Sequence, residues 1–241
     1  MNVIEINGLV VEYGRVKALD GVSLQVRKGE IFGFLGPNGA GKSTTIKALL
    51  GLIPARSGSV LLHGFAPQDI RSRQKVGFLP EEATYYRFLT PRELLGFYGE
   101  LFGIEKKVLE GRIQKLLTMV GLSQVQDRQI RTFSKGMVQK VSLAQALINE
   151  PETLILDEPM SGLDPVSRLE LRQTMTRLKA EGKTLFFSSH ELSEVELLCD
   201  SVAILRAGKL IRSGSLTEVL HEGRDKSLET FFLDTIKGGA S

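Results

Sequence analysis

Apolar positions along this sequence form two patterns, short runs typical of strands over much of the chain and helical spacing concentrated between residues 90 and 149. Between residues 90 and 149 they recur every three or four residues, as on one face of a helix. Elsewhere the apolar residues form short runs typical of strands, and in the N-terminal stretch these runs are broken by glycines. These runs predict strands at 3–13, 22–26, 31–36, 58–62, 76–79, 153–157, 183–188, 201–206 and 209–212.

Helix starts are marked by capping residues. Thr90 to Glu93 forms a capping box with proline at the first helical position, and Ser215 to Glu218 forms a second box. Further helices are predicted over 105–120, from about Lys135 onward, and from Asp164-Pro165 toward residue 180. Strands that alternate with helices predict an α/β fold with a mainly parallel sheet and an inserted helical segment.

Composition and charge exclude several classes of protein. The 241 residues include 31 Lys+Arg and 28 Asp+Glu, so the net charge is +3, too small to indicate nucleic-acid binding. No apolar run approaches the roughly 20 residues that a membrane-spanning helix needs, so we expect no direct membrane insertion. One cysteine allows no internal disulfide, which fits a reducing compartment. We therefore expect a cytoplasmic protein.

The stretch GPNGAGKS at residues 36–43 matches the phosphate-binding loop pattern between a predicted strand and a predicted helix. Its glycines allow backbone N–H groups to turn toward a polyphosphate, and the helix adds its positive end. Lys42 is expected to reach the terminal phosphates, and Ser43 to offer its hydroxyl to Mg²⁺. The predicted nucleotide-binding residues here are Gly36, Pro37, Asn38, Gly39, Ala40, Gly41, Lys42, Ser43 and Thr44.

A second acidic motif, TLILDEP at 153–159, predicts a buried strand with two carboxylates at its carboxyl end. We expect Asp157 to hold Mg²⁺ and Glu158 to act as general base on the attacking water. Together with the phosphate loop, this motif predicts an ATP- and Mg²⁺-dependent hydrolysis site, with Lys42 and Glu158 as catalytic residues.

At this point the chain resembles the nucleotide-binding subunit of ATP-binding cassette (ABC) transporters, essentially from end to end. Tyr13 resembles the aromatic residue that stacks on adenine, and His190 the switch histidine that contacts the γ-phosphate. FSKGM at 133–137 is similar to the family signature, and SGLD at 161–164 to the D-loop. The resemblance implies one ABC ATPase domain with an N-terminal antiparallel subdomain.

The domain organisation implied by the resemblance is a nucleotide-binding core over 1–87 and 150–241, with a helical subdomain over 88–149. In this family two subunits pair head to tail on binding ATP. Ser134, Lys135, Gly136 and Asp164 are therefore expected to contact the ATP of the partner subunit. An integral membrane permease is the implied second partner, and would hold the chain on the cytoplasmic face of the plasma membrane.

Two departures from the family pattern, and one aromatic cluster, bear on these expectations. Glu81 stands where the family has a glutamine, and we predict that it contacts Mg²⁺. Lys135 and Met137 replace the glycine and glutamine usual in the signature, a pattern that resembles the type-2 exporter group. The aromatic cluster at residues 85–88 is interpreted either as core packing or as part of a groove for the membrane subunit.

Two other functions compete with an exporter ATPase. A soluble ABC ATPase of the iron–sulfur assembly branch has the same motifs and no permease. A module that binds nucleotide without hydrolysing it is opposed by the intact set of Asp157, Glu158 and His190.

Overall fold

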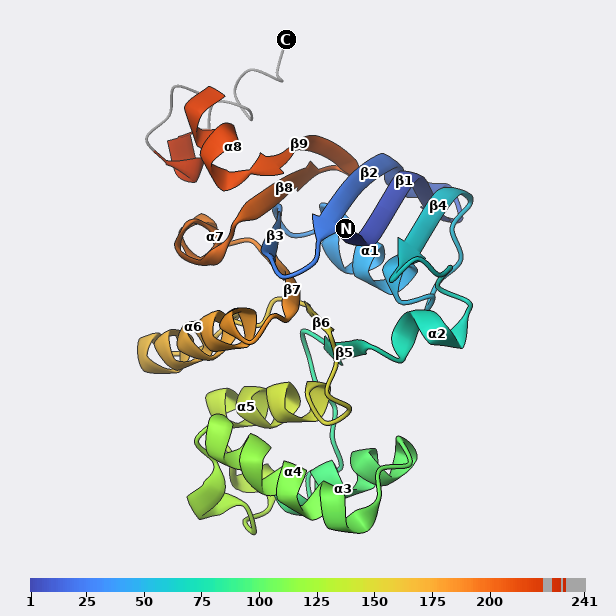
Figure 1. Ribbon diagram of the computed structural model, residues 1–241. Coiled ribbons are helices and arrows are strands. Elements are labelled where there is room, and N and C mark those ends of the chain that lie inside the picture. Colours follow the sequence, from blue (N-terminus) through green and yellow to red (C-terminus); the bar gives the residue numbers. More distant parts are fainter. Residues whose placement is uncertain (223–226, 231, 233–241) are drawn as a thin grey trace. The chain divides into compact units, whose positions relative to one another are not determined.

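The computed structural model describes residues 1–222, 227–230 and 232, and the chain divides into two compact units. The first unit contains residues 1–73 and the described residues from 184 onward, and the second contains residues 74–183 (Figure 1). Within the described residues, no helix has both the length and the apolar character needed to cross a membrane.

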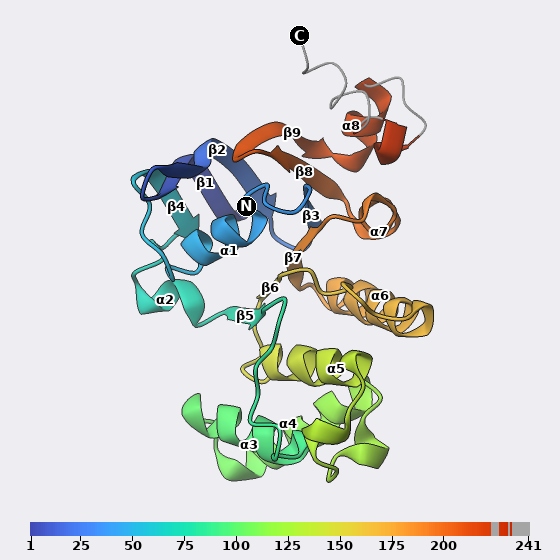
Figure 2. The same ribbon diagram turned by 180° about the vertical axis from the view of Figure 1, so that it is seen from behind.

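The first unit contains an antiparallel sheet of β1 (Asn2–Tyr13), β2 (Val16–Arg27) and β4 (Ser57–Leu62), with β1 in the middle. Along β2 the residues Val22, Leu24 and Val26 are buried, and the residues between them are exposed. This alternation is expected where a sheet has one covered face, because successive side chains point to opposite sides. Helix α1 (Lys42–Leu49) lies beside this sheet in both views (Figures 1 and 2).

The same unit contains a group of parallel strands, β7 (Thr184–Ser189), β3 (Ile31–Leu35) and β8 (Ser201–Arg206). Strand β9 (Lys209–Ser215) pairs antiparallel with β8 and leads into α8 (Leu216–Glu222). Every residue of β3 and β7 is buried, which explains why β3 and the middle of β7 (residues 185–187) are continuous apolar runs without alternation. Phe32 stacks on Phe186 between them, with ring centroids 5.7 Å apart.

Helix α7 (Leu192–Leu198) packs against β3, and the sequence patterns did not predict it. Gly33 makes the close approach possible, because a Cβ at this position would stand 2.7 Å from the Cys199 Sγ and 2.8 Å from Val195. The helix is short and its N-terminus has no side-chain cap, so it carries little sequence signal.

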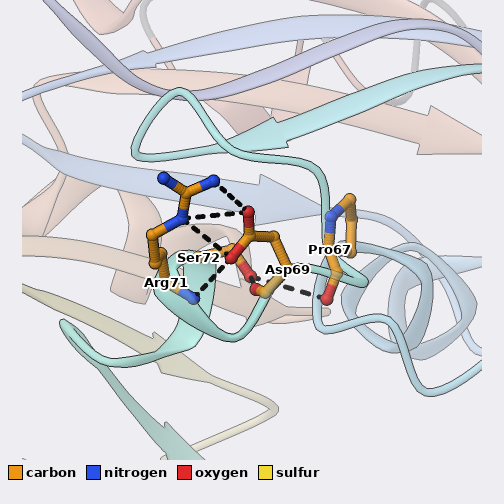
Figure 3. A network of polar contacts seen from close by, with 4 residues as sticks. All are labelled: Pro67, Asp69, Arg71 and Ser72. Atoms are coloured by element: carbon orange, nitrogen blue, oxygen red, sulfur yellow. Dashed lines mark hydrogen bonds and ion pairs between the residues drawn. The ribbon is translucent and has the colours of Figure 1, made fainter.

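The segment after β4 is folded tightly around α2 (Ile70–Arg73). The Arg71 guanidinium donates to both carboxylate oxygens of Asp69, with its Nε 3.0 Å from each (Figure 3). It also lies 4.3 Å from the centre of the Phe65 ring. These hydrogen bonds lower the pKa of Asp69 to about 2. The buried Ser72 hydroxyl donates to the Asp69 carbonyl at 2.7 Å.

The second unit contains the parallel pair β5 (Val76–Leu79) and β6 (Thr153–Leu156) together with most of the helices. Its helical elements are α3 (Pro91–Leu101), α4 (Lys106–Met119), η1 (Ser123–Val125), η2 (Ile130–Thr132), α5 (Lys135–Ala146) and α6 (Pro165–Ala180). Helix α5 lies directly on β5, since a Cβ on Gly77 would collide with the Ala146 carbonyl oxygen.

These sheets and helices confirm the predicted α/β class with mainly parallel strands and an N-terminal antiparallel sheet. The capping box before α3 forms: Thr90 N–H donates to Glu93 at 2.8 Å, and Glu93 N–H donates to the Thr90 hydroxyl at 3.2 Å. The corresponding bonds between Ser215 and Glu218 form before α8. The predicted subdomain boundaries at 87 and 150 stay a prediction. The two compact units divide after Arg73 and after Lys183.

Candidate functional site

The predicted phosphate loop joins β3 to α1 in the first unit. Its glycines are required by the local packing: a Cβ on Gly36 would collide with the Leu205 carbonyl oxygen. Gly41 has φ 109, and a Cβ there would stand 2.7 Å from the Leu19 side chain and 2.9 Å from the Ala18 carbonyl oxygen. Only glycine fits a position that is both left-handed and crowded.

Helix α1 begins at Lys42 without a side-chain cap, because its N-cap residue is Gly41. Lys42 is 6% exposed, and its ammonium donates to the carbonyl oxygens of Gly36 at 2.7 Å and Pro37 at 3.3 Å. The side chain thus bends back over the loop. A cation and uncapped amide groups at one helix start create a local environment that favours an anion.

His190 lies at the same loop. Leu35 at the end of β3 pairs in parallel with Ser189, and the Gly36 N–H donates to the Ser189 carbonyl at 3.2 Å. Because of this register, His190 follows directly beside the loop, and with Gly36, Pro37 and Asn38 it lines a hollow of about 260 Å³. The structure therefore brings the predicted switch histidine to the predicted phosphate loop.

The other predicted residues of this unit lie near or apart from that hollow. Ser43 and Thr44 are half-buried in the first turn of α1. Tyr13 ends β1 with 49% of its surface exposed, so its ring is accessible for stacking, but it does not line the hollow.

The acidic motif lies in the second unit, at the end of β6. Asp157 and Glu158 are each 6% exposed, and the Asp157 N–H extends the strand ladder by donating to the Leu79 carbonyl at 2.8 Å. Glu158 has φ 46, a left-handed conformation that is uncommon for a residue with a side chain. Such backbone conformations occur preferentially at functional sites.

Glu81 follows β5, the parallel partner of β6, so Glu81 and Asp157 follow carboxyl ends at the same sheet edge. Glu81 is exposed and lines a hollow of about 480 Å³ in this unit, together with Tyr85, Arg131, Lys135 and Gln139. No structural finding tests its predicted metal contact, which stays a prediction.

The aromatic cluster at residues 85–88 divides between its two interpretations. Burial raises the pKa of Tyr85 to about 12, as expected for packing into the helical unit. Tyr86 and Phe88 are instead 64% and 63% exposed, with ring centroids 5.8 Å apart. Core packing therefore accounts for Tyr85, and the other two rings form an exposed apolar surface.

The signature begins α5 as predicted. Ser134 is the N-cap, and its hydroxyl accepts from the Met137 N–H at 3.3 Å. Gly136 is buried, and a Cβ there would stand 2.6 Å from the Ser167 hydroxyl oxygen. Asp164 caps α6 and accepts from the Ser167 N–H at 3.0 Å and hydroxyl at 2.6 Å. These bonds lower the pKa of Asp164.

One residue of interest has no counterpart among the predictions. Gln139 is 8% exposed on α5, and its Nε2 donates to the Pro159 carbonyl at 2.9 Å. The sequence signal that could have found Gln139 is its polar side chain, four residues after Lys135. The other buried positions of this helix are mostly apolar or small.

Comparison with known proteins gives a consistent result. The family model described as ABC transporter matches residues 19–161. An uncharacterised ABC transporter ATP-binding protein of Synechocystis is 49% identical over 227 residues, which is 93% of this chain and 62% of the relative. The ABC transporter ATP-binding protein NatA of Bacillus subtilis is 37% identical over 94% of this chain and 93% of its own length.

The chain spans 62% of the length of the Synechocystis relative and of a Nostoc relative that is 52% identical. The linearmycin resistance ATP-binding protein LnrL of Bacillus subtilis is 39% identical over 86% of this chain and 67% of its own. A solved ATP-binding subunit of an ABC transporter superposes with a TM-score of 0.88 at 32% identity, covering 97% of this chain and 99% of that one. An ATP-binding cassette solved in its ADP conformation gives 0.83 at 26% identity. These superpositions confirm the predicted ABC ATPase fold.

Proposed function

Because this chain belongs to the ABC transporter family, we propose that it binds and hydrolyses ATP to energise a membrane-spanning subunit on a separate chain, as part of an exporter. The observation that carries the proposal is the start of α1. There the uncapped helix terminus and the Lys42 ammonium favour a polyphosphate, and His190 lines the adjoining hollow.

The residues present fit a Mg²⁺ ion. A buried carboxylate at Asp157 and a hydroxyl at Ser43 are hard oxygen donors of the kind that Mg²⁺ prefers. Among residues 1–222, 227–230 and 232, no group of three or more His, Cys, Asp or Glu could hold a metal ion alone. Mg²⁺ is usually bound by one or two protein groups together with waters and substrate phosphates. Glu81 is the third proposed contact.

Each remaining residue has a proposed role in the reaction. Glu158 accepts a proton from the attacking water, Lys42 and His190 bind the terminal phosphate, and Tyr13 stacks on adenine. When bound, Mg²⁺ neutralises phosphate charge that develops during the reaction. Burial of Glu158 keeps bulk water away from the proposed base.

The proposed partners are a second nucleotide-binding subunit and a permease. ATP joins two copies head to tail, with Ser134, the N–H groups of Lys135 and Gly136, and Asp164 facing the ATP of the other copy. The permease holds this chain at the cytoplasmic face of the membrane. Two relatives, named for linearmycin resistance and for lantibiotic transport, favour export as the direction.

The test is the rate of Mg²⁺-dependent ATP hydrolysis by the purified chain and its Lys42→Ala variant. Loss of the ammonium should lower the rate by about 10²- to 10³-fold, as for other preorganised phosphate or oxyanion donors. Lys47→Ala is the matched control, because Lys47 is exposed on the same helix. Wild-type hydrolysis by Lys42→Ala would contradict the proposal. Co-purification with an integral membrane protein tests the transport half.

A further inference from the structure

One face of the signature helix α5 contacts the segment that follows Glu158. Lys135 and Gln139 are four residues apart, so they lie on the same side of the helix. The Gln139 amide donates to the carbonyl oxygen of Pro159, the residue next to Glu158, at 2.9 Å. Gln139 is 8% exposed, so this bond is shielded from water and its loss leaves a buried carbonyl without that partner.

Lys135 lies over the D-loop of the same unit. A Cβ on Gly162 would collide with the Lys135 ammonium and would stand 3.3 Å from its Cε and 3.5 Å from its Cδ. The aliphatic stem therefore runs across Gly162, which has φ 67. Within the described part of the chain, the Lys135 ammonium has no ion pair or hydrogen bond, and its side chain packs on this turn.

These two contacts lie at either end of one turn. The Ser161 N–H donates to the Glu158 carbonyl at 3.1 Å and closes a turn that contains Pro159. Gln139 holds the turn at Pro159, and Lys135 covers the residue that follows Ser161. The left-handed Glu158 is part of the same turn. A strained backbone conformation persists only when the surrounding contacts hold it in place. The contacts of Gln139 and Lys135 hold the turn that contains Glu158.

We propose that Gln139 and Lys135 are positioning residues, which fix the turn carrying Glu158 relative to the signature segment Ser134–Gly136. The side chain of Lys135 serves this turn, and only its backbone N–H faces the partner's ATP. For its catalytic consequence the proposal rests on the proposed function of Glu158. Closure of a partner subunit on the signature segment then acts directly on the conformation of the base.

Hydrogen exchange on the nucleotide-free full chain tests the positioning by itself. Gln139→Met keeps the volume and removes the donor, and should speed exchange of the amides at 158–164 by about 2- to 30-fold. Gln145→Met is the matched control, because Gln145 is half-buried on the same helix and, within the described residues, its side chain forms no hydrogen bond with this turn. Unchanged exchange in Gln139→Met overturns the proposal.

Lys135 supplies a second test at an exposed position where folding is not at risk. Lys135→Ala removes the stem and should speed exchange at 160–164, whereas Lys135→Met keeps the stem and should leave exchange near wild type. Equal protection in all three proteins overturns the role of the stem. Lys140→Ala is the control, since Lys140 joins α5 to α6 by its 2.8 Å ion pair with Glu170 without touching the turn.

Steady-state kinetics adds a readout that a purely structural role would not move. In Gln139→Met, kcat should fall by about 2- to 30-fold while the KM for Mg-ATP changes by less than about twofold. Gln139→Glu should recover toward wild type as the pH falls, because only the protonated acid can donate to Pro159. A KM effect without a kcat effect overturns positioning through Glu158. Hydrogen exchange is measured without nucleotide, so its result does not depend on the proposed ATPase activity. Failure of the positioning proposal can therefore be told apart from failure of the proposed function.

Discussion

The helix that begins at the phosphate loop and the helix that begins at the signature are built differently. Helix α1 starts after Gly41 with no side-chain cap, whereas Ser134 caps α5 by accepting from the Met137 N–H. Asp164 likewise caps α6, because its Oδ1 accepts from the N–H groups of Val166 and Ser167. An uncapped start needs another acceptor for its amides, and a capped start has satisfied part of that need internally. The start of α1 in the first unit therefore favours an anion more strongly than the capped helix starts do. The second unit contains the two carboxylates of the acidic motif, Asp157 and Glu158.

Glu158→Gln should separate binding from hydrolysis most sharply. Loss of a positioned general base lowers rates by about 10²- to 10⁴-fold, while the first unit and Asp157 keep their groups for ATP and metal. Bound ATP should then persist and hold two copies together. Size-exclusion chromatography with and without Mg-ATP, beside the wild type, measures this. A monomer in ATP, despite demonstrated binding, would contradict the head-to-tail pairing.

Gly41→Ala tests the uncapped start of α1 directly. The left-handed backbone would cost about 1–3 kcal/mol, and the Cβ would press on Leu19 and the Ala18 carbonyl. If the loop shifts to relieve this, ATP affinity should fall by about 10-fold, as 1.4 kcal/mol implies. Gly39→Ala is the control, since Gly39 has φ 77 but open space around it. Equal affinities in both variants, measured by titration calorimetry, would show that crowding is unimportant.

Ser134 allows capping to be separated from anion binding. Ser134→Ala should lower the free energy of unfolding by about 1 kcal/mol, whereas Ser134→Asp retains an N-cap and should stay within about 0.5 kcal/mol of wild type. The added carboxylate should nevertheless repel the partner's phosphate and abolish the ATP-bound dimer in the Glu158→Gln background. Urea unfolding and chromatography provide the two measurements. A stable Ser134→Asp dimer would remove the signature from the proposed interface.

Asp69→Asn gives the smallest effect and concerns stability alone. Since its pKa is lowered from 3.8 to about 2, Asp69 contributes stability above about pH 4 that is lost as the pH falls toward 2. The variant should melt about 1–2 °C lower at pH 7, because an exposed pair is largely screened. The difference should vanish near pH 2, and ATP hydrolysis should be unchanged. A melting difference that is independent of pH would point to a cause other than this ionisation.

Local signals explain how much of the fold could be predicted. The strands at 76–79 and 201–206 were predicted to the residue, since short apolar runs bounded by polar residues or proline mark both strands. Helices α3 and α8 were found from capping boxes. Helices α2 and α7 were missed, because four and seven residues hold too few apolar positions to show a helical period.

The candidate site was only partly accessible from the sequence. Motifs predicted the phosphate loop and the acidic pair, and the parallel register of β3 and β7 explains why His190 follows beside the predicted loop. The contacts of Gln139 and Lys135 with the turn after Glu158 could not be foreseen, because they join residues 20 or more positions apart and depend on tertiary packing. The left-handed φ of Glu158 could not be predicted from the sequence, because glutamate, unlike glycine, does not favour this conformation.

Because Glu158 is left-handed, the stability of the fold and the activity proposed for this residue favour different amino acids at position 158. Glycine would adopt φ 46 at position 158 freely, whereas a residue with a side chain bears about 1–2 kcal/mol there. Random mutation followed by screening for thermal stability alone should therefore enrich Glu158→Gly, and the same screen for turnover should remove it. Selection for thermal stability alone is therefore expected to remove the proposed general base at position 158.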